Sequence, residues 1–390
     1  MTCRFLEGFS AQTFLAPVTQ EVFRSQHWER APLLFRRNNR DYYDNLFTLA
    51  DFDRQLASSP GKVVTLEAKS GAYTRYRDES GALPLEHVMS EMRGGMTLLL
   101  EHQHRREEKL GVLCRLLQQH FGHRFETNLY LTPPHGRGLQ PHWDNHDTFV
   151  MQVVGSKHWK VDKERRKLPG RNEQISDPKR EMTANCLAFT LEQGDMIYIP
   201  RGTMHAAECG AGPSLHITVG VRAYTWEDLL NAITGAAFLG DEALRAALPL
   251  GFMENDGGSL AQTARAMLAK IANERFVAAA VDYFKDSVVT HATMDISGQV
   301  TSFFQPNDLT DADVVGSRPG IVYTLHDADD SVRVNFGSRS IIFPSFFKQP
   351  LEFALKTPRY AVGEIAGELE NEEKIVFVER LMEEGLVVRK

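Results

Sequence analysis

The sequence has few cysteines and no long apolar run, and these two absences exclude several classes of protein. Its 390 residues include four cysteines, and none of them forms a C-x-x-C pair. Neither a disulfide framework nor a cysteine zinc site is therefore expected. No run approaches the roughly 18 apolar residues of a membrane span, and the N-terminal residues lack the apolar core of a secretory signal. We expect no membrane association and a cytoplasmic location.

The chain also lacks an excess of positive charge. Its 44 Lys and Arg residues stand against 51 Asp and Glu residues, which gives a formal net charge of −7. Nucleic acids and anionic membranes attract basic surfaces, so the overall charge favours neither partner. The hydrophobic share of 42% is ordinary for a globular protein. The length suggests two or three domains of about 150 residues each.

Short apolar runs separated by turns dominate the middle of the chain, from about residue 95 to 225. This pattern is typical of an antiparallel barrel or jelly roll. Residues 148–154 and 158–161 flank Gly155-Ser156, which predicts a hairpin. Residues 109–120 have the spacing of an amphipathic helix, and the polar, basic segment 163–179 predicts a surface loop.

The remainder of the chain has helical and then mixed patterns, so the fold class that we expect overall is α+β. Residues 226–238 and 259–284 carry apolar stripes at helical spacing, as in a core or a dimer interface. The C-terminal part resembles a winged helix-turn-helix, with helices predicted over 346–355, 360–369 and 372–383. From residue 331 onward, nine basic residues stand against nine acidic ones. A DNA-reading domain normally has a basic face, so direct DNA binding is not expected.

Two potential metal ligands, His142 and Asp144, stand two residues apart in the predicted barrel. In an extended strand, both side chains leave the same face. His205 follows a Gly-Asp turn, a short apolar strand and a proline, which is how a barrel strand returns to present one more ligand. Two imidazoles and one carboxylate on one face of a metal are typical of non-haem Fe(II) sites for oxygen chemistry. The alternative is three structural side chains, and the context favours the metal site.

Several neighbours adjoin these three residues. His146 has the same parity as the first two but lies further along the strand, and Asp147 has the opposite parity, so we assign both to supporting or surface roles. Lys157 is either an exposed lysine at the hairpin tip or a cation for a carboxylate. Tyr130 either offers its hydroxyl to the same anion or is a core tyrosine. Spacing decides neither question.

Five segments of the barrel region closely resemble the JmjC-type ribosomal oxygenases of the cupin-4 group. They are residues 128–134, 140–144, 149–159, 194–205 and 214–218. Residues 27–34 also look like the N-terminal segment of that family. The resemblance implies a double-stranded β-helix (jelly-roll) catalytic domain with its N-terminal cover in residues 1–225, a helical dimerisation region in 226–310 and a winged-helix domain in 311–390. The family's winged-helix unit is not usually a DNA reader.

The same resemblance implies the chemistry of the site. Fe(II) is expected on His142, Asp144 and His205, with O2 as co-substrate. The second implied co-substrate is 2-oxoglutarate, with its distal carboxylate on Lys157 and with Tyr130 and Asn128 nearby. The implied activity is hydroxylation of an arginine or histidine side chain of a ribosomal protein, and the implied assembly is a homodimer.

The chain departs from these relatives beside the metal ligands, where Trp143, Asn145 and His146 replace the usual Tyr followed by acidic or apolar residues. The basic segment 163–179 also differs from the family core. These differences leave the substrate open, and a free amino acid or a biosynthetic peptide is the main variant. Two alternative functions belong to other classes of protein. One is a non-catalytic cupin sensor with a DNA-binding tail, and the other is a cupin isomerase or dioxygenase that uses another metal and no 2-oxoglutarate.

Overall fold

The computed structural model describes residues 3–58, 63–66, 73–75, 85–136, 138–170, 173, 182–254, 258–304 and 308–390. The chain divides into two compact units, Met1–Ala223 and Tyr224–Lys390. Among the described residues, no helix combines the length and the apolar character needed to cross a bilayer. Part of the predicted 163–179 loop, namely 171–172 and 174–179, lies outside the described residues.

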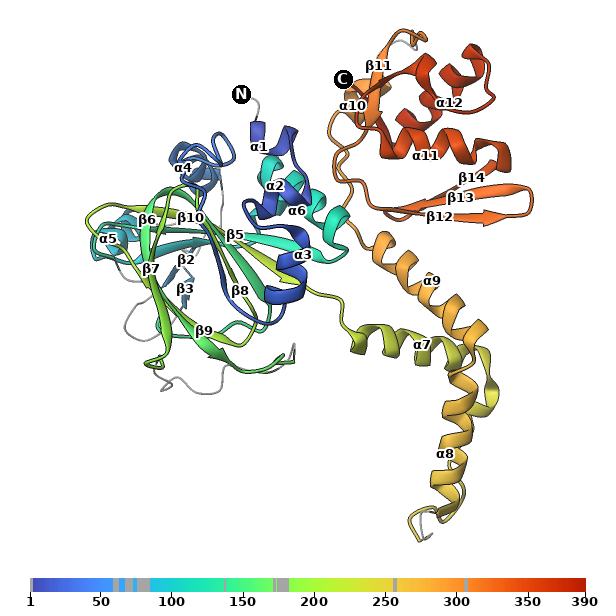
Figure 1. Cartoon of the computed structure of the whole chain (residues 1–390), viewed down its shortest axis with the longest axis horizontal. Helices are drawn as coiled ribbons and strands as arrows, with labels where there is room; N and C mark the ends of the chain where they lie inside the picture. Colours follow the sequence, from blue (N-terminus) through green and yellow to red (C-terminus); the bar gives the residue numbers. More distant parts are fainter. Residues whose placement is uncertain are drawn as a thin grey trace. The chain divides into compact units, whose positions relative to one another are not determined.

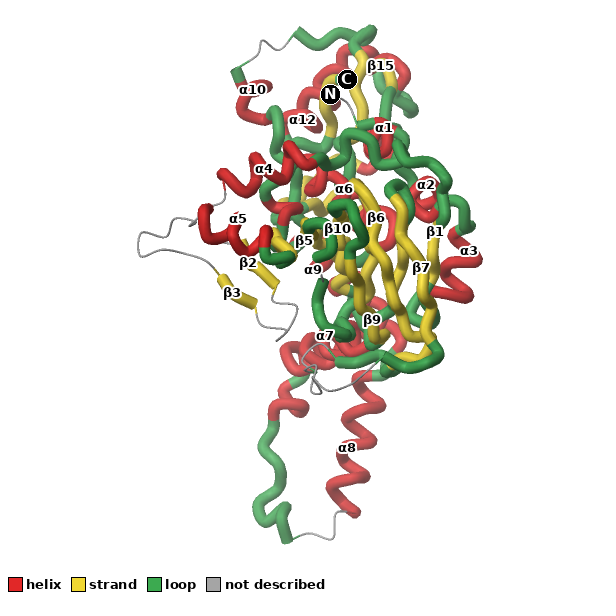
Figure 2. The backbone as a smooth tube through the Cα atoms, turned by 90° about the vertical axis from the view of Figure 1, so that its left-hand side faces the viewer, coloured by secondary structure: helices red, strands yellow, loops and turns green. Residues whose placement is uncertain are grey.

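Ten described strands of the first unit form one antiparallel, curved sheet (Figures 1 and 2). Their order is β1-β8-β6-β10-β5-β4-β2-β3, and β7 and β9 pair with β6. The strands are β1 (Leu33–Phe35), β2 (Val63–Leu66), β3 (Tyr73–Arg75), β4 (Thr97–Leu100), β5 (Arg124–Thr132), β6 (Asp147–Arg165), β7 (Cys186–Glu192), β8 (Met196–Ile199), β9 (Thr203–Glu208) and β10 (Ser214–Arg222). The antiparallel barrel that the turn-separated runs predict is therefore present.

Helices lie around this barrel, from α5 at the left of Figure 1 to α3 at the right, and several of them contribute to the main core. They are α1 (Arg4–Glu7), α2 (Ala11–Leu15), α3 (Gln20–Val22), the π turn Phe23–His27, α4 (Leu49–Ser58), α5 (Leu85–Arg93), the 3-10 turn Gln103–Arg105 and α6 (Glu108–Phe121). The amphipathic helix predicted over 109–120 is thus confirmed as α6. Its buried face contributes Leu110, Leu113 and Leu117 to the main core.

Alternation along β5 and β10 separates this core from the inside of the barrel. Phe125 and Leu129 of β5, and Ile217 of β10, belong to the same core cluster as α6. Because successive side chains of a strand point to opposite faces, the residues between them face the barrel interior. These interior positions are polar, and they include Asn128, Tyr130 and Thr132 on β5 and Ser214, His216 and Thr218 on β10.

Strand β6 runs without a break through Gly155, so the hairpin predicted there is wrong. Its first half pairs with β8 and β10, and its second half pairs with β7 and β9. Gly155 has a φ of +66°, and a Cβ there would clash with the carbonyl oxygen of Pro213. Glycine permits this bend without a chain reversal. The bend carries Lys157 to the inside of the barrel instead of to a hairpin tip.

A buried polar network joins the N-terminal segment to the barrel. The Tyr198 hydroxyl on β8 donates to Asp147 at 2.6 Å and accepts from the backbone N–H of Glu29 at 2.8 Å. Arg201 pairs with the Glu29 carboxylate and lies 3.6 Å from Asp147. Burial raises the pKa of Asp147. The surface role considered for Asp147 is therefore wrong, and the residue supports the segment that carries Asp144 three residues earlier.

Replacing Asp147 with alanine should destabilise the protein by about 3 kcal/mol, because the Tyr198 hydroxyl loses its buried acceptor and the Arg201 guanidinium loses a nearby buried carboxylate. For a domain of this size the melting temperature should fall by roughly 2–4 °C per kcal/mol. Calorimetry measures this change. Asp53→Ala, at an exposed position of α4, is the control and should stay within about 0.5 kcal/mol. A loss no larger than that of the control would contradict the structural role of Asp147.

The second unit contains a helical part followed by two small sheets. Its elements are α7 (Trp226–Gly240), the 3-10 turn Glu242–Arg245, α8 (Gly258–Ile271), α9 (Glu274–Thr290), α10 (Gln299–Phe303), β11 (Val314–Ser317), β12 (Tyr323–Ala328), β13 (Ser331–Phe336), β14 (Arg339–Pro344), the 3-10 turn Ser345–Phe347, α11 (Lys348–Lys356), β15 (Tyr360–Ala361), the 3-10 turn Val362–Glu364, α12 (Asn371–Glu383) and β16 (Val387–Arg389). The sheets have the orders β15-β11-β16 and β12-β13-β14.

Two sequence predictions in this unit are wrong in detail. The apolar stripe over 259–284 is divided into α8 and α9, because the Asn273 side chain accepts the backbone N–H of Phe276 and begins a new helix. The helix predicted over 360–369 is β15 and a short 3-10 turn, since Tyr360 pairs with Val315 of β11. The predictions of α11 and α12 are confirmed, and both helices pack on the core of this unit.

Candidate metal centre

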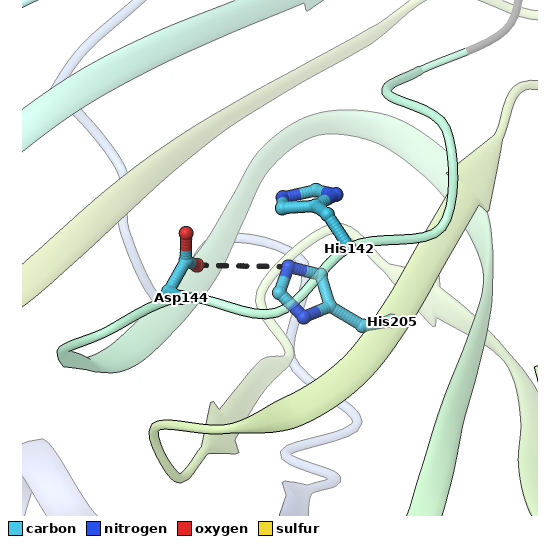
Figure 3. A group of neighbouring side chains, drawn as sticks. All are labelled: His142, Asp144 and His205. Carbon is cyan, nitrogen blue, oxygen red and sulfur yellow. Dashed lines mark ion pairs between the residues drawn. The ribbon is translucent and has the colours of Figure 1, made fainter. Parts of the chain in front are cut away.

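The structure brings the side chains of His142, Asp144 and His205 together (Figure 3). One ligand atom of each residue lies within 4.8 Å of the other two. The Asp144 Oδ2 atom is 3.7 Å from Nε2 of His205. Two of the residues also share a backbone bridge, in which the N–H of His142 donates to His205 at 3.2 Å and the N–H of His205 donates to His142 at 2.8 Å. Apart from this bridge, the His142–Asp144 segment is irregular and not the extended strand that was predicted.

Backbone carbonyls orient both imidazoles. The Nδ1 atom of His142 lies 2.8 Å from the carbonyl oxygen of Gln140, and Nδ1 of His205 lies 3.0 Å from that of Thr203. A carbonyl only accepts, so in each ring Nδ1 carries the proton and the lone pair is on Nε2. Such outer hydrogen bonds fix the tautomer of metal-binding histidines.

The charges of the three side chains suit a divalent cation. Burial and the neighbouring His142 lower the pKa of His205 to about 4, so this imidazole is neutral near pH 7. Desolvation would raise the pKa of Asp144, but His146, His142 and His205 outweigh it, and the pKa is lowered. Metal ligands must be deprotonated, and both groups meet that condition at neutral pH. Two imidazoles and one carboxylate are a donor set that fits Fe(II) and similar transition metals.

Lys157 is buried on the inside of the barrel, with 2% of its surface exposed. Its Nζ donates to the hydroxyl of Thr132 at 2.9 Å, and burial lowers the pKa of Lys157 to about 8. Among the described residues, no carboxylate forms an ion pair with it. A buried cation that lacks an anionic partner is costly, and an anionic ligand would relieve that cost. Of the two alternatives for Lys157, the exposed one is wrong.

The other two predicted anchors differ in position. Tyr130 lines the cavity at the metal site and stacks on His216, with ring centroids 4.9 Å apart. Asn128 lies two residues before Tyr130 on the same face of β5. Its side-chain oxygen accepts a hydrogen bond from the backbone N–H of His102 at 2.9 Å. Tyr130 is therefore placed to contact a ligand beside Lys157, whereas Asn128 does not line the cavity.

The cavity at the metal site has a volume of about 50 Å³ and adjoins a larger groove of about 540 Å³. Both are lined by Gly138, Leu139, Trp159, Ala206 and Ala207. The wall of the small cavity also includes side chains that sequence reasoning did not single out, namely Thr148, Trp159 and His216. Strand alternation could have identified His216 from the sequence, because His216 and Thr218 occupy interior positions of β10.

The residues that depart from the relatives have distinct surroundings. Trp143 is buried, and the guanidinium of Arg166 lies 5.9 Å from its ring centre. His146 is half-buried beside Gly220, where a Cβ would meet its ring. His146 is also one of the groups that lower the pKa of Asp144.

Comparison with known proteins identifies a matching domain family and similar proteins that share one name. Residues 99–229 match the JmjC domain family. Over 235 residues, 57% of this chain, the sequence is 37% identical to ribosomal oxygenase 1 of Gallus gallus, of which it covers 38%. It is 30% identical to ribosomal oxygenase 2 of Bos taurus over 252 residues, 61% of this chain and 54% of that protein. The chain thus spans about half the length of these curated relatives or less.

Two solved structures of the Escherichia coli ribosomal oxygenase YcfD have the same fold. One matches 96% of this chain and 98% of its own with a TM-score of 0.60 at 16% identity. The other, a complex with cobalt and 2-oxoglutarate, matches 95% and 98% with a TM-score of 0.58 at 15% identity. The expected JmjC-type, cupin-like barrel is therefore confirmed.

Proposed function

Because this chain carries a JmjC domain and is a homologue of the ribosomal oxygenases, we propose that it is a 2-oxoglutarate- and Fe(II)-dependent oxygenase that hydroxylates a protein side chain. The observation that carries the proposal is the convergence of His142, Asp144 and His205 in a cavity that also contains the buried cation of Lys157. The substrate that we propose is a ribosomal protein, as the names of the relatives suggest. The residue that we propose is an arginine or histidine, as the family resemblance implies.

The residues of the site have separate roles in binding the metal and the keto acid. Nε2 of His142, Nε2 of His205 and the Asp144 carboxylate would hold the metal and leave other positions open to co-substrates. When bound, Fe(II) supplies the redox chemistry that couples decarboxylation of the keto acid to oxidation of a C–H bond. Lys157 and Thr132 would bind the distal carboxylate. In the balanced reaction, one oxygen atom of O2 enters succinate, the other becomes the hydroxyl group, and CO2 is released.

Binding of the keto acid requires side chains to move. One water molecule needs about 10–15 Å³ of cavity volume. The cavity of about 50 Å³ therefore holds only a few waters. A five-carbon acid needs more room. Lys157 has a flexible stem and, within the described part of the chain, one hydrogen-bonded partner, Thr132, so we expect its side chain to rearrange around the ligand.

The affinity for 2-oxoglutarate should fall above about pH 8. The pKa of Lys157 is lowered to about 8 by burial, and only its protonated form offers a charge to the carboxylate. The groups that face it are His216, which burial keeps neutral, and the Cys209 thiol, whose pKa burial raises. Above the pKa of Lys157, affinity should decrease by up to about tenfold per pH unit. Calorimetric titration from pH 6.5 to 9.5 measures this, and a flat profile across pH 8 would contradict the role of Lys157.

The groove beside the cavity is where we place the substrate polypeptide. Replacing the exposed Ala188 in its lining with tryptophan should lower kcat/KM for a protein substrate by about tenfold, since a loss of 1.4 kcal/mol suffices. Consumption of 2-oxoglutarate without substrate should not change. Ala184→Trp, at an exposed position outside the lining, is the matched control. Equal effects of both variants on kcat/KM would refute this placement.

The second unit suits assembly better than DNA binding. We propose that residues 226–310 mediate a homodimer, because several large apolar side chains of this region are exposed in the single chain. They include Trp226, Leu239, Leu250, Met253 and Tyr283. We also propose that residues 311–390 are a winged-helix domain without direct DNA binding, consistent with their ten basic residues against fourteen acidic ones. Light scattering of the full chain, with a mass of 44.0 kDa per protomer, tests the dimer.

Anaerobic reconstitution with Fe(II) and 2-oxoglutarate tests the function as a whole. Admitting O2 together with a ribosomal protein extract should give succinate and a one-oxygen mass gain on one peptide. A cupin isomerase or another dioxygenase would yield no succinate. A DNA-binding sensor would give a salt-sensitive DNA complex without turnover. Bound iron with no succinate from any extract would count against the proposal, whereas a free amino acid or a small peptide as substrate would change only its final step.

A further inference from the structure

Three buried polar atoms belong to residues that line the metal-site cavity, and these atoms have no hydrogen-bond partner among the described residues. They are Nε1 of Trp159, Nδ1 of His216 and Oγ1 of Thr148. Trp159 is 6% exposed and the other two residues are 3% exposed. A buried donor without an acceptor costs free energy, and native structures contain few such groups. The Trp159 indole N–H can only donate, and the imidazole and the hydroxyl can also donate, so three such groups on residues of one small cavity indicate a ligand with oxygen acceptors.

The positions of the two rings indicate which part of the site they serve. Trp159 lies two residues beyond Lys157 on β6, and its ring centre is 6.1 Å from that of His205 and 5.7 Å from that of His216. Tyr130 stacks on the imidazole of His216 at an interplanar angle of 10°. Trp159 thus adjoins a metal ligand, His216 adjoins Trp159, and Lys157 lies on the same face of β6 as Trp159. An indole N–H only donates, so its partner must be an acceptor.

We propose that the ring N–H groups of Trp159 and His216 donate hydrogen bonds to the oxygens of the keto acid between the metal and Lys157. This inference rests on the proposed function, because it assumes that 2-oxoglutarate is the ligand of this cavity. Two neutral donors orient the acid without placing a further positive charge beside the lysine and the metal. Tyr130 holds the imidazole in position by stacking.

Binding of 2-oxoglutarate to the Co(II)-loaded protein, measured by calorimetry without turnover, tests this proposal. Trp159→Phe and His216→Phe keep an aromatic ring but remove the donor, and each should raise Kd about tenfold, which is about 1.4 kcal/mol. His216→Asn retains an N–H near the position of Nδ1 and should stay within about threefold of the wild type. Affinity for Co(II) alone should not change in any variant.

Trp28→Phe is the matched control, because it removes an indole N–H from a half-buried residue outside the cavity wall. Thermal melting of each variant shows whether it is folded. Wild-type affinity in both Trp159→Phe and His216→Phe would overturn the inference and leave the proposed function intact. If the wild-type protein itself binds no 2-oxoglutarate, the proposed function and this inference both fail. An equal loss of affinity in His216→Asn and His216→Phe would show that the imidazole acts by packing and would also overturn the donor role.

Discussion

Replacement of Asp144 with alanine should abolish hydroxylation and weaken metal binding by more than about 100-fold. Asp144 supplies the one anionic ligand of the triad, and its carboxylate lies 3.7 Å from Nε2 of His205. Loss of a group that merely orients a metal ligand typically costs 10–100-fold in affinity or activity, so loss of the ligand itself should cost more. Co(II) titration and succinate formation measure the two effects.

The comparison for this variant is Asp147→Asn, which changes the neighbouring carboxylate of the Tyr198 network but no ligand of the metal. It should lose stability while retaining metal binding at a temperature where it is folded. Asp144→Ala should show the reverse pattern, with its fold intact. Stoichiometric, wild-type metal binding by Asp144→Ala would refute the assignment of the triad.

Replacement of Lys157 with alanine should raise the Kd for 2-oxoglutarate by about 100-fold, because removal of one partner of a buried charge pair costs about 2–5 kcal/mol. Lys157→Met removes the charge but keeps most of the side-chain volume, so it should lose affinity to a similar extent without leaving a cavity. Calorimetric titration of the metal-loaded protein measures both. Unchanged affinity for 2-oxoglutarate would refute the assignment of this lysine.

Lys157→Met should weaken the binding of 2-oxoglutarate without lowering the stability of the free protein. In the free protein, Lys157 is a buried cation with a hydroxyl as its only hydrogen-bond partner among the described residues. Replacing such a group with an apolar side chain of similar volume is often neutral or stabilising. The melting temperature of Lys157→Met should therefore equal or exceed that of the wild type. Lys160→Ala, at an exposed position of the same strand, should change neither stability nor affinity.

The pH dependence of stability provides a separate check on Lys157. Burial lowers its pKa in the folded chain to about 8, whereas an unfolded lysine titrates near 10.4. Between these values the unfolded state binds more protons, so this residue makes the protein more stable as pH rises through that range. Lys157→Met should remove that contribution. Denaturant unfolding of the wild type and of Lys157→Met at pH 7.5 and pH 9.5 measures this contribution.

Local patterns in the sequence were sufficient to predict the barrel, helix α6 and the three potential metal ligands. Strand alternation and turn spacing depend on neighbouring residues, and the amphipathic spacing of residues 109–120 requires only one buried face. The resemblance of five barrel segments to ribosomal oxygenases also depends on short runs of sequence. These features involve few assumptions about distant parts of the chain, and they agree with the structure.

Other features depended on the tertiary structure. A glycine with positive φ occurs both in a hairpin turn and in a bend of one continuous strand, and at Gly155 the pairing with β10 decides between them. That pairing places Lys157 inside the barrel, and the burial of Asp147 depends in the same way on Tyr198 of β8. Among the described residues, the ring nitrogens of Trp159 and His216 that lack a partner are visible only in the tertiary structure. Sequence determined which groups could carry the chemistry of the metal site, whereas long-range strand pairing decided which of them are buried, which are charged and which still lack a partner.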